Sequence, residues 1–159
     1  MSILRQNALK RSKKMKKQPI LVSACLLGVC CRYDGASKPN SAVCELRDRY
    51  VLLPVCPEVD GGLPTPRTPS ERVGDRVLMR DGKDVTENYA AGAEAALDRA
   101  RTFGCTMAIL KARSPSCGKG EIYDGSFSGN LTFRDGVAAE LLQKNGIQVF
   151  TEDEIDKLP

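Results

Sequence analysis

Four short apolar runs are spaced along the chain, each bounded by polar or turn residues. They cover residues 20–24, 51–55, 107–111 and 147–150. Short runs that lack a regular polar alternation are typical of strands buried on both faces of a parallel sheet. We therefore expect four buried strands.

Three amphipathic stretches lie between these runs and repeat apolar residues at helical spacing. They predict helices over 40–49, 86–103 and 135–145, followed by a short helix at the end of the chain. Each begins at a residue that commonly caps helices: Asn40 or Ser41, Thr86, and Asp135. Gly104 ends the longest helix.

The remaining segments contain turn residues. Residues 57–71 hold four prolines and two glycines, which predicts a long loop without helix or central strand. Residues 72–85 predict a small hairpin that pairs 77–79 with 83–85 around Asp81-Gly82. Because strands alternate with helices, we expect an α/β fold. It is an open, mainly parallel, Rossmann-like sheet of about four strands, with helices on both faces and a projecting hairpin.

Charge is divided unevenly along the chain. Residues 1–17 hold seven of the 24 Lys and Arg residues and no acid, which leaves 17 basic and 20 acidic residues, a net charge of −3, in the remainder. We expect residues 1–18 to form a disordered basic tail and residues 19–159 a single domain. Contact of the tail with RNA or another polyanion is a less favoured alternative, and a transit peptide is another. No apolar run is long enough for a membrane helix.

Histidine is absent from the chain, whereas cysteine occurs seven times. Without histidine, Ser-His-Asp and Cys-His mechanisms are excluded, and any metal site must use thiolates or carboxylates. The odd number of cysteines and the lack of an export signal argue against a disulfide framework. We expect reduced thiols in the cytoplasm, some of them used for metal binding or catalysis.

Three cysteines follow predicted strands. Cys25 and Cys56 come directly after the first two strands, and Cys117 comes a few residues after the third. The carboxyl ends of parallel strands meet at one edge of a sheet, so these thiols could converge there. Three thiolates suit a soft metal or an iron–sulfur cluster, and on a four-iron cluster they would leave one iron open. Zinc and a plain packing role remain alternatives.

Other residues near these strand ends are weaker candidates. Glu58 would share a face with Cys56 in an extended segment and could activate water, or it could be a solvated loop carboxylate. The adjacent Cys30 and Cys31 could form a redox pair or accept sulfur. Cys44 and Cys105 are interpreted as packing residues. Four basic residues could place positive charge around the pocket, or they could belong to the ordinary solvated surface: Arg67, Lys111, Arg113 and Lys119.

A series of short motifs joins these candidates. In order they are Val-Ser-Ala-Cys-Leu-Leu-Gly (22–28), Arg-Tyr-Asp-Gly (32–35), Cys-Pro-Glu (56–58), Gly-Leu-Pro-Thr-Pro-Arg (62–67), Asp-Val-Thr (84–86) and Ser-Pro-Ser-Cys-Gly (114–118). Together they resemble the thiouracil desulfidase family, which consists of small bacterial iron–sulfur proteins. The resemblance spans about residues 20–155, and the ordered set is specific although each motif alone is weak.

The resemblance implies a 4Fe–4S cluster held by Cys25, Cys56 and Cys117, a catalytic Glu58 and a substrate-contacting Ser114. In the implied mechanism the thiocarbonyl sulfur binds the open iron and Glu58 helps water attack the carbon. Sulfur leaves as hydrogen sulfide without net electron transfer. Related proteins with an added RNA-binding domain act on thiolated tRNA. We find no such domain here and expect a thiolated pyrimidine base or nucleoside, such as 2-thiouracil, as substrate.

Two other functions fit the same residues. One is an iron–sulfur or metal-binding sulfur carrier or sensor without desulfidase activity. The other is a thiol-redox protein that uses Cys30 and Cys31.

Overall fold

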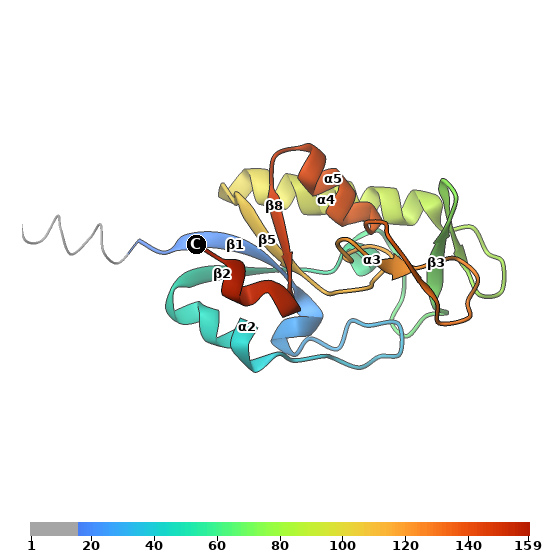
Figure 1. The fold of residues 1–159 in the computed structure, drawn as a ribbon, viewed down its shortest axis with the longest axis horizontal. Coiled ribbons are helices and arrows are strands. Elements are labelled where there is room, and N and C mark those ends of the chain that lie inside the picture. Colours follow the sequence, from blue (N-terminus) through green and yellow to red (C-terminus); the bar gives the residue numbers. More distant parts are fainter. Residues whose placement is uncertain (1–15) are drawn as a thin grey trace, which may run out of the picture.

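The computed structural model describes residues 16–159, so most of the expected basic tail lies outside the described residues (Figure 1). Four parallel strands form the main sheet in the order β2-β1-β5-β8, which confirms the predicted fold class. These strands are β1 (Gln18–Ser23), β2 (Tyr50–Val55), β5 (Met107–Leu110) and β8 (Gln148–Thr151). Strand β1 thus begins inside the segment that we expected to be tail.

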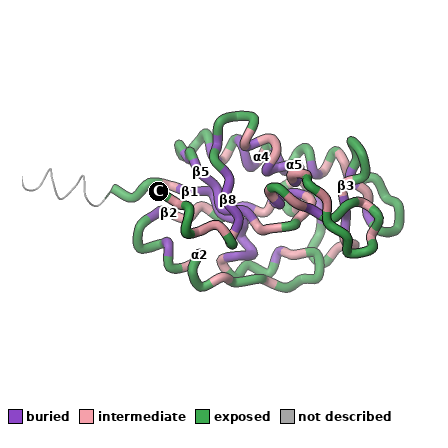
Figure 2. Tube along the Cα trace, viewed as in Figure 1, coloured by how far each residue is buried: buried purple, intermediate pink, exposed green. Residues whose placement is uncertain are grey.

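Helices cover both faces of this sheet, and each face has its own apolar core (Figures 1 and 2). Leu21 of β1 faces the first core, whereas its neighbours Ile20 and Val22 face the second, as the two-residue period of a strand requires. The first core contains residues of α4 (Thr86–Phe103) and α5 (Val137–Lys144). The second lies under α2 (Ser41–Glu45) and the short 3₁₀ helices η1 (Ala24–Leu27), η2 (Leu46–Asp48) and η3 (Glu152–Lys157).

The strand register brings the carboxyl ends of the strands to one edge. Ser23 of β1 lies opposite Val55 of β2, and Leu110 of β5 lies opposite Thr151 of β8. The residues that follow these positions therefore begin their loops on the same side of the sheet. Among the described residues, no helix is both long and apolar enough to cross a membrane.

The helix predicted over 40–49 is confirmed with Asn40 as its cap, although it changes from α-helix to the 3₁₀ helix η2 after Glu45. Two other local predictions were wrong. β2 is an edge strand with Val51 46% exposed, because only β1 pairs with it. The loop predicted over 57–71 contains a short helix, α3 (Pro57–Asp60). Proline is compatible with the first turn of a helix, whose N–H groups have no partner within the helix.

The projecting hairpin lies earlier in the chain than predicted, because residues 76–79 pair with the segment before them and not with the segment after them. β3 (Ser70–Val73) pairs with β4 (Arg76–Met79), and the expected partner 83–85 adds only a bridge between Leu78 and Asp84. A second small hairpin consists of β6 (Ile122–Tyr123) and β7 (Leu131–Thr132).

Two predicted helix caps were also wrong, and both side chains bind other partners. Thr86 is the first residue of α4, and its Oγ1 accepts a hydrogen bond from the Val77 amide at 2.9 Å. Asp135 accepts a hydrogen bond from the Gly120 amide at 2.7 Å instead of capping α5. The predicted end of α4 is confirmed, since Gly104 has φ +72° there.

Candidate active site at the carboxyl edge of the sheet

A cavity of about 530 Å³ opens at the carboxyl ends of β1, β2 and β5. Three of its lining residues are the cysteines that the strand pattern placed at this edge, Cys25, Cys56 and Cys117. Glu58 and Ser114 line the same cavity. The structure thus brings all five predicted site residues together, while their chemical roles stay predictions.

Cys25 is placed by the turn that follows β1. It lies in the 3₁₀ helix η1, which ends at Gly28 with φ +96°, a conformation that favours glycine. The carbonyl of Cys25 accepts a hydrogen bond from the Lys38 amide at 2.9 Å, which ties the returning loop to this turn. The Cys25 side chain is consequently buried, with 7% of the residue exposed.

Cys56 and Glu58 are placed by α3, where Cys56 is the N-cap and Glu58 is in the first turn. We expected an extended segment to align these two side chains, and a helical turn does so instead. α3 packs so closely on α4 that a Cβ added to Gly92 would lie 1.8 Å from the carbonyl oxygen of Pro57. Only glycine at this position allows α3 to approach so closely.

Cys117 is placed by the start of α5. The amides of Val137 and Ala138 donate to the carbonyls of Pro115 and Ser116 at 2.9 and 2.8 Å. The loop 114–118 therefore satisfies helix-start amides that would otherwise lack partners. Gly136 permits this approach, since an added Cβ would lie 2.6 Å from the carbonyl carbon and oxygen of Ser116.

Burial raises the proton affinity of two of the three thiols. It raises the pKa of Cys25 to about 11, against the opposing effect of the Lys111 and Arg32 charges. It raises the pKa of Cys117 to about 12, although hydrogen bonds from Ser23 and Ser116 lower it. All three cysteines would have to lose protons to bind a metal, so metal loading would release protons at this site.

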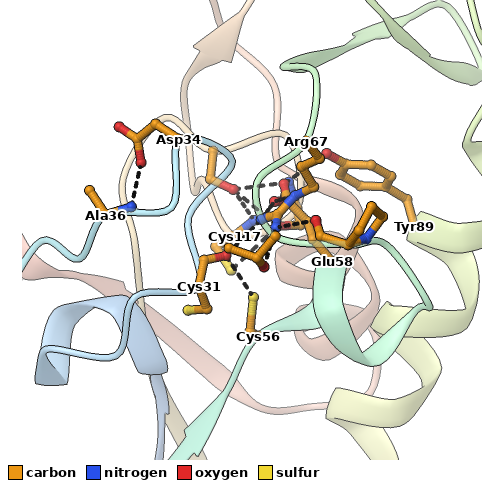
Figure 3. Close-up of polar contacts among 12 residues, drawn as sticks. Cys31, Asp34, Ala36, Cys56, Glu58, Arg67, Tyr89 and Cys117 are labelled. Atoms are coloured by element: carbon orange, nitrogen blue, oxygen red, sulfur yellow. Dashed lines mark hydrogen bonds and ion pairs between the residues drawn. The ribbon is translucent and has the colours of Figure 1, made fainter.

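Glu58 is held by three side chains (Figure 3). Arg67 forms an ion pair with Oε2, and the exposed fractions of the two side chains are only 3% and 14%. Tyr89 donates to Oε1 at 2.7 Å, and the Ser116 hydroxyl lies 3.5 Å from the same oxygen. The carboxylate therefore has a defined direction within the cavity. Sequence reasoning missed Tyr89 and Ser116, and it considered Arg67 only as general positive charge.

Ser114 organises its own loop. Its Oγ accepts hydrogen bonds from the amides of Ser116 and Cys117 at 3.2 and 3.1 Å, and lies 3.0 Å from the Ser116 Oγ. A serine hydroxyl that accepts hydrogen bonds from amides two and three residues further along the chain in this way is a common turn feature. Ser114 thus helps to fix Cys117 in addition to facing the cavity.

Cys31 is a fourth thiol in the cavity. The Cys56 thiol donates to the Cys31 carbonyl at 3.7 Å, and a side-chain hydrogen bond with Cys31 lowers the pKa of Cys56 to about 7. The Cys31 carbonyl accepts a hydrogen bond from Arg67 at 2.9 Å (Figure 3). Cys30 is exposed and does not line the cavity. The adjacent cysteines therefore lie in different environments, and the one that sequence reasoning undervalued is Cys31.

Cys44 and Cys105 lie outside this cavity. Cys105 belongs to the first apolar core, and the Cys44 thiol donates to the Leu26 carbonyl at 3.6 Å. Of the four basic residues considered from sequence, Arg67, Lys111 and Arg113 line the cavity, whereas Lys119 forms an ion pair with Glu154.

The donor set suits an iron–sulfur cluster. Thiols from three separate segments, and no imidazole, surround one cavity. Within residues 16–159, no group of three His, Cys, Asp or Glu side chains is close enough to hold one metal ion.

Comparisons with known proteins agree on one family. Residues 20–154 match the family model described as 2-thiouracil desulfurase. The uncharacterized protein YbbK of Bacillus subtilis (strain 168) is 39% identical over 149 residues, which cover 87% of this chain and 99% of that protein. The solved structure of the [4Fe-4S]-dependent thiouracil desulfidase TudS is 47% identical, with a TM-score of 0.85, and the match covers 89% of this chain and 95% of that one. On this evidence the chain belongs to the 2-thiouracil desulfurase family.

Proposed function

We propose that this protein removes sulfur from a thiolated pyrimidine base or nucleoside, such as 2-thiouracil, at a 4Fe–4S cluster held by Cys25, Cys56 and Cys117. The observation that carries the proposal is the convergence of these three thiols with Glu58 in one cavity. The family match and the 47% identity to a [4Fe-4S]-dependent thiouracil desulfidase support it. The overall reaction exchanges the thiocarbonyl for a carbonyl: C=S and water give C=O and hydrogen sulfide, with no change in electron count.

When bound, the cluster would supply a Lewis-acidic iron with high affinity for sulfur. Glu58 acts on water in this proposal. Its Oε1 accepts from Tyr89 and its Oε2 from Arg67, so the carboxylate is oriented without a histidine. From this position it takes a proton from the water that attacks the thiocarbonyl carbon.

The reduced state of the thiols is part of the proposal. All of the cysteines in the described residues are free, which suits a reducing compartment, and we infer a cytoplasmic location. The binding partner is a small thiolated molecule. RNA contact through residues 1–15 is a separate, less favoured hypothesis, and those residues lie outside the described part of the chain.

The test begins with iron and acid-labile sulfide analysis of protein purified without oxygen, followed by assay of sulfide release from 2-thiouracil. We expect both iron and turnover. Replacing Cys25, Cys56 or Cys117 by Ser should sharply lower the iron content, whereas Cys44→Ser, outside the cavity, should not. Normal iron in all three cavity variants would refute the ligand assignment.

Glu58→Gln separates the cluster from the chemistry. It keeps the size of the side chain but removes the proton acceptor, so iron content should stay normal while turnover falls by about 10²-fold or more. Full turnover in this variant would remove Glu58 from the mechanism. Iron without sulfide release in the wild-type protein would instead favour a sulfur carrier or sensor.

A further inference from the structure

Part of the cavity wall comes from the two small hairpins and not from the main sheet. Arg80, which follows β4, and Phe127, in the turn between β6 and β7, both line the cavity. The guanidinium carbon of Arg80 lies over the Phe127 ring, 5.9 Å from its centre, within the range of a cation–π interaction. The thiols and Glu58 line the same cavity from the carboxyl edge of the sheet. An aromatic ring and the candidate reacting groups therefore share one space.

The backbone of Phe127 is held in an unfavourable conformation. Its φ is +54°, in the left-handed region that a bulky side chain rarely adopts. Among residues 16–159, the one other non-glycine residue with a positive φ is Arg113, which also lines the cavity. A glycine at either position would avoid this strain. Both strained positions thus fall at the cavity, and strain of this kind is typical of functional residues.

A buried carboxylate maintains the conformation of Phe127. Only 9% of Glu71, in β3, is exposed. Its Oε1 accepts hydrogen bonds from the amides of Gly125 and Phe127 at 3.0 and 3.1 Å. These bonds restrain the turn strongly, because a hydrogen bond to an ionised acceptor is about twice as strong as a neutral one. Glu71 therefore fixes the direction in which the Phe127 side chain leaves the backbone.

The turn that carries Phe127 also packs tightly on β3. Gly125 has φ +95°, and a Cβ added to it would lie 2.6 Å from the carbonyl oxygen of Arg72. Within the turn, Asp124 accepts hydrogen bonds from the amide and the hydroxyl of Ser126. All of these contacts lie within the protein and do not require a ligand. Little conformational entropy would therefore be lost when a ligand contacts Phe127.

Three tyrosines line the cavity as well, but their surroundings differ from those of Phe127. Tyr89 uses its hydroxyl to hold Glu58. Tyr33 and Tyr123 are 43% and 38% exposed. Phe127 is half-buried, and its side chain has no polar atom. Its contribution to binding must therefore come from apolar contact and from the π-face of its ring.

We propose that Phe127 is a specificity-determining residue that stacks on the ring of the thiolated pyrimidine, with Glu71 and Arg80 as its positioning residues. This inference rests on the proposed desulfidase function. Arg80 covers one face of the Phe127 ring and the substrate covers the other. Stacking of a base on an aromatic side chain typically strengthens binding by about 5- to 100-fold. It holds the flat ring and leaves the thiocarbonyl free to face Glu58 and the thiols.

The test uses two ligands with the same thiocarbonyl: 2-thiouracil, which is flat, and dihydro-2-thiouracil, whose saturated ring cannot stack as well. Their dissociation constants are measured by equilibrium dialysis on cluster-loaded protein, together with iron content, kcat and KM. For Phe127→Ala we expect unchanged iron, a dissociation constant and KM for 2-thiouracil raised about 10-fold, and little change in kcat. Binding of dihydro-2-thiouracil should weaken by about 2-fold or less. Phe133→Ala is the matched control, because Phe133 is 97% exposed and lies outside the cavity.

The positioning role of Glu71 is tested with two further variants. Glu71→Ala removes the acceptor of both amides and should weaken 2-thiouracil binding almost as much as Phe127→Ala does. Glu71→Gln keeps a carbonyl oxygen that can accept both hydrogen bonds, so it should retain most of the affinity. In the double variant Glu71→Ala/Phe127→Ala, the loss should be close to that of Phe127→Ala alone, because both changes remove the same contact. Normal binding in Glu71→Ala would overturn the positioning role.

The remaining outcomes separate the stacking from the proposed function. A wild-type protein that loads iron but releases no sulfide overturns the function, while the dialysis values still test Phe127. Normal 2-thiouracil binding in Phe127→Ala overturns the stacking, as does an equal loss for both ligands or an equal loss in Phe133→Ala. If Phe127→Ala fails to fold, Phe127→Tyr and Phe127→Leu decide, because both keep the bulk and only the first keeps a ring. Equal binding of 2-thiouracil by these two variants would overturn the stacking.

Discussion

The two loops that carry the candidate site are held in different ways. The segment 56–67, with Cys56 and Glu58, depends on a charged side-chain network centred on Arg67, together with the packing of α3 on Gly92. The segment 114–118, with Cys117, depends on backbone hydrogen bonds to the start of α5. The first loop should therefore be sensitive to the loss of side chains, whereas the second should be sensitive to any change that moves its backbone.

The largest expected effect is on the charged network. Arg67→Met leaves the Glu58 carboxylate without its ion-pair partner in a mostly buried position, which should lower the free energy of unfolding by about 3 kcal/mol. The matched control is Arg113→Met. It breaks an ion pair with Glu121 whose side chains are 47% and 44% exposed, so it should cost about 0–1 kcal/mol. Denaturant unfolding of both variants measures the difference, and equal losses would contradict a special role for Arg67.

The next effect concerns the packing of the same loop on α4. Gly92→Ala places a methyl group 1.8 Å from the Pro57 carbonyl oxygen, so α3 must shift and take Cys56 and Glu58 with it. We expect a loss of about 1–3 kcal/mol, reduced by up to about 1 kcal/mol because alanine favours helix. Iron content should also fall. Ala91→Ser, on the exposed side of the same helix, is the control, and normal iron in Gly92→Ala would show that α3 does not need this contact.

A smaller effect is expected in the second loop. The methyl group of Gly136→Ala would lie 2.6 Å from the Ser116 carbonyl, a less severe overlap than at Gly92. The loop 114–118 should move away from α5, which should lower the free energy of unfolding by about 1 kcal/mol. Because this movement displaces Cys117, iron content should fall more than so small a loss of stability would suggest. Lys144→Ala, exposed at the far end of α5, serves as control. Turnover and iron that match the wild type would mean that the backbone contact does not position Cys117.

The smallest effect lies at the start of α4, which supports the first loop. Asp84 accepts hydrogen bonds from Thr86 and Arg76, and these lower its pKa to about 2. Because the folded pKa is below the unfolded value of about 3.9, this contribution is present above pH 4 and is lost as the pH falls toward 2. Asp84→Ala should thus lower the melting temperature slightly at pH 7 and by less near pH 2. An equal loss at both pH values would show that ionisation of Asp84 is not the cause.

Much of the fold followed from local patterns, and the errors have a common origin. The four strands and the helix α4 were predicted because their apolar spacing depends only on neighbouring residues. Errors occurred at α3, at the β3–β4 hairpin and at the two helix starts. At these places, contacts between residues far apart in the sequence determine the local structure. Thr86 looked like a cap from sequence, but its hydroxyl accepts from Val77 in the adjacent hairpin. Asp135 likewise binds Gly120 in the neighbouring loop.

The candidate site shows the same division. Cys25, Cys56 and Cys117 could be placed at one edge because each follows a predicted parallel strand, and parallel strands share a direction. The partners of Glu58 could not be found in this way. Tyr89 lies on one face of α4 like any core residue, and Ser116 is one of two serines in a short loop. Cys31 could have been considered as a site residue because it lies between two recognised motifs, but no feature of the local sequence separates it from Cys30.

The amino-acid pattern alone determined that this chain would form a parallel α/β sheet with three thiols at the ends of its strands, since both features depend on short-range periodicity. Only the tertiary structure decided which side chains hold Glu58 and which hydroxyl joins it to Cys117. Those contacts form between loops that approach closely at Gly92 and Gly136, and such approaches depend on backbone packing rather than on residue spacing.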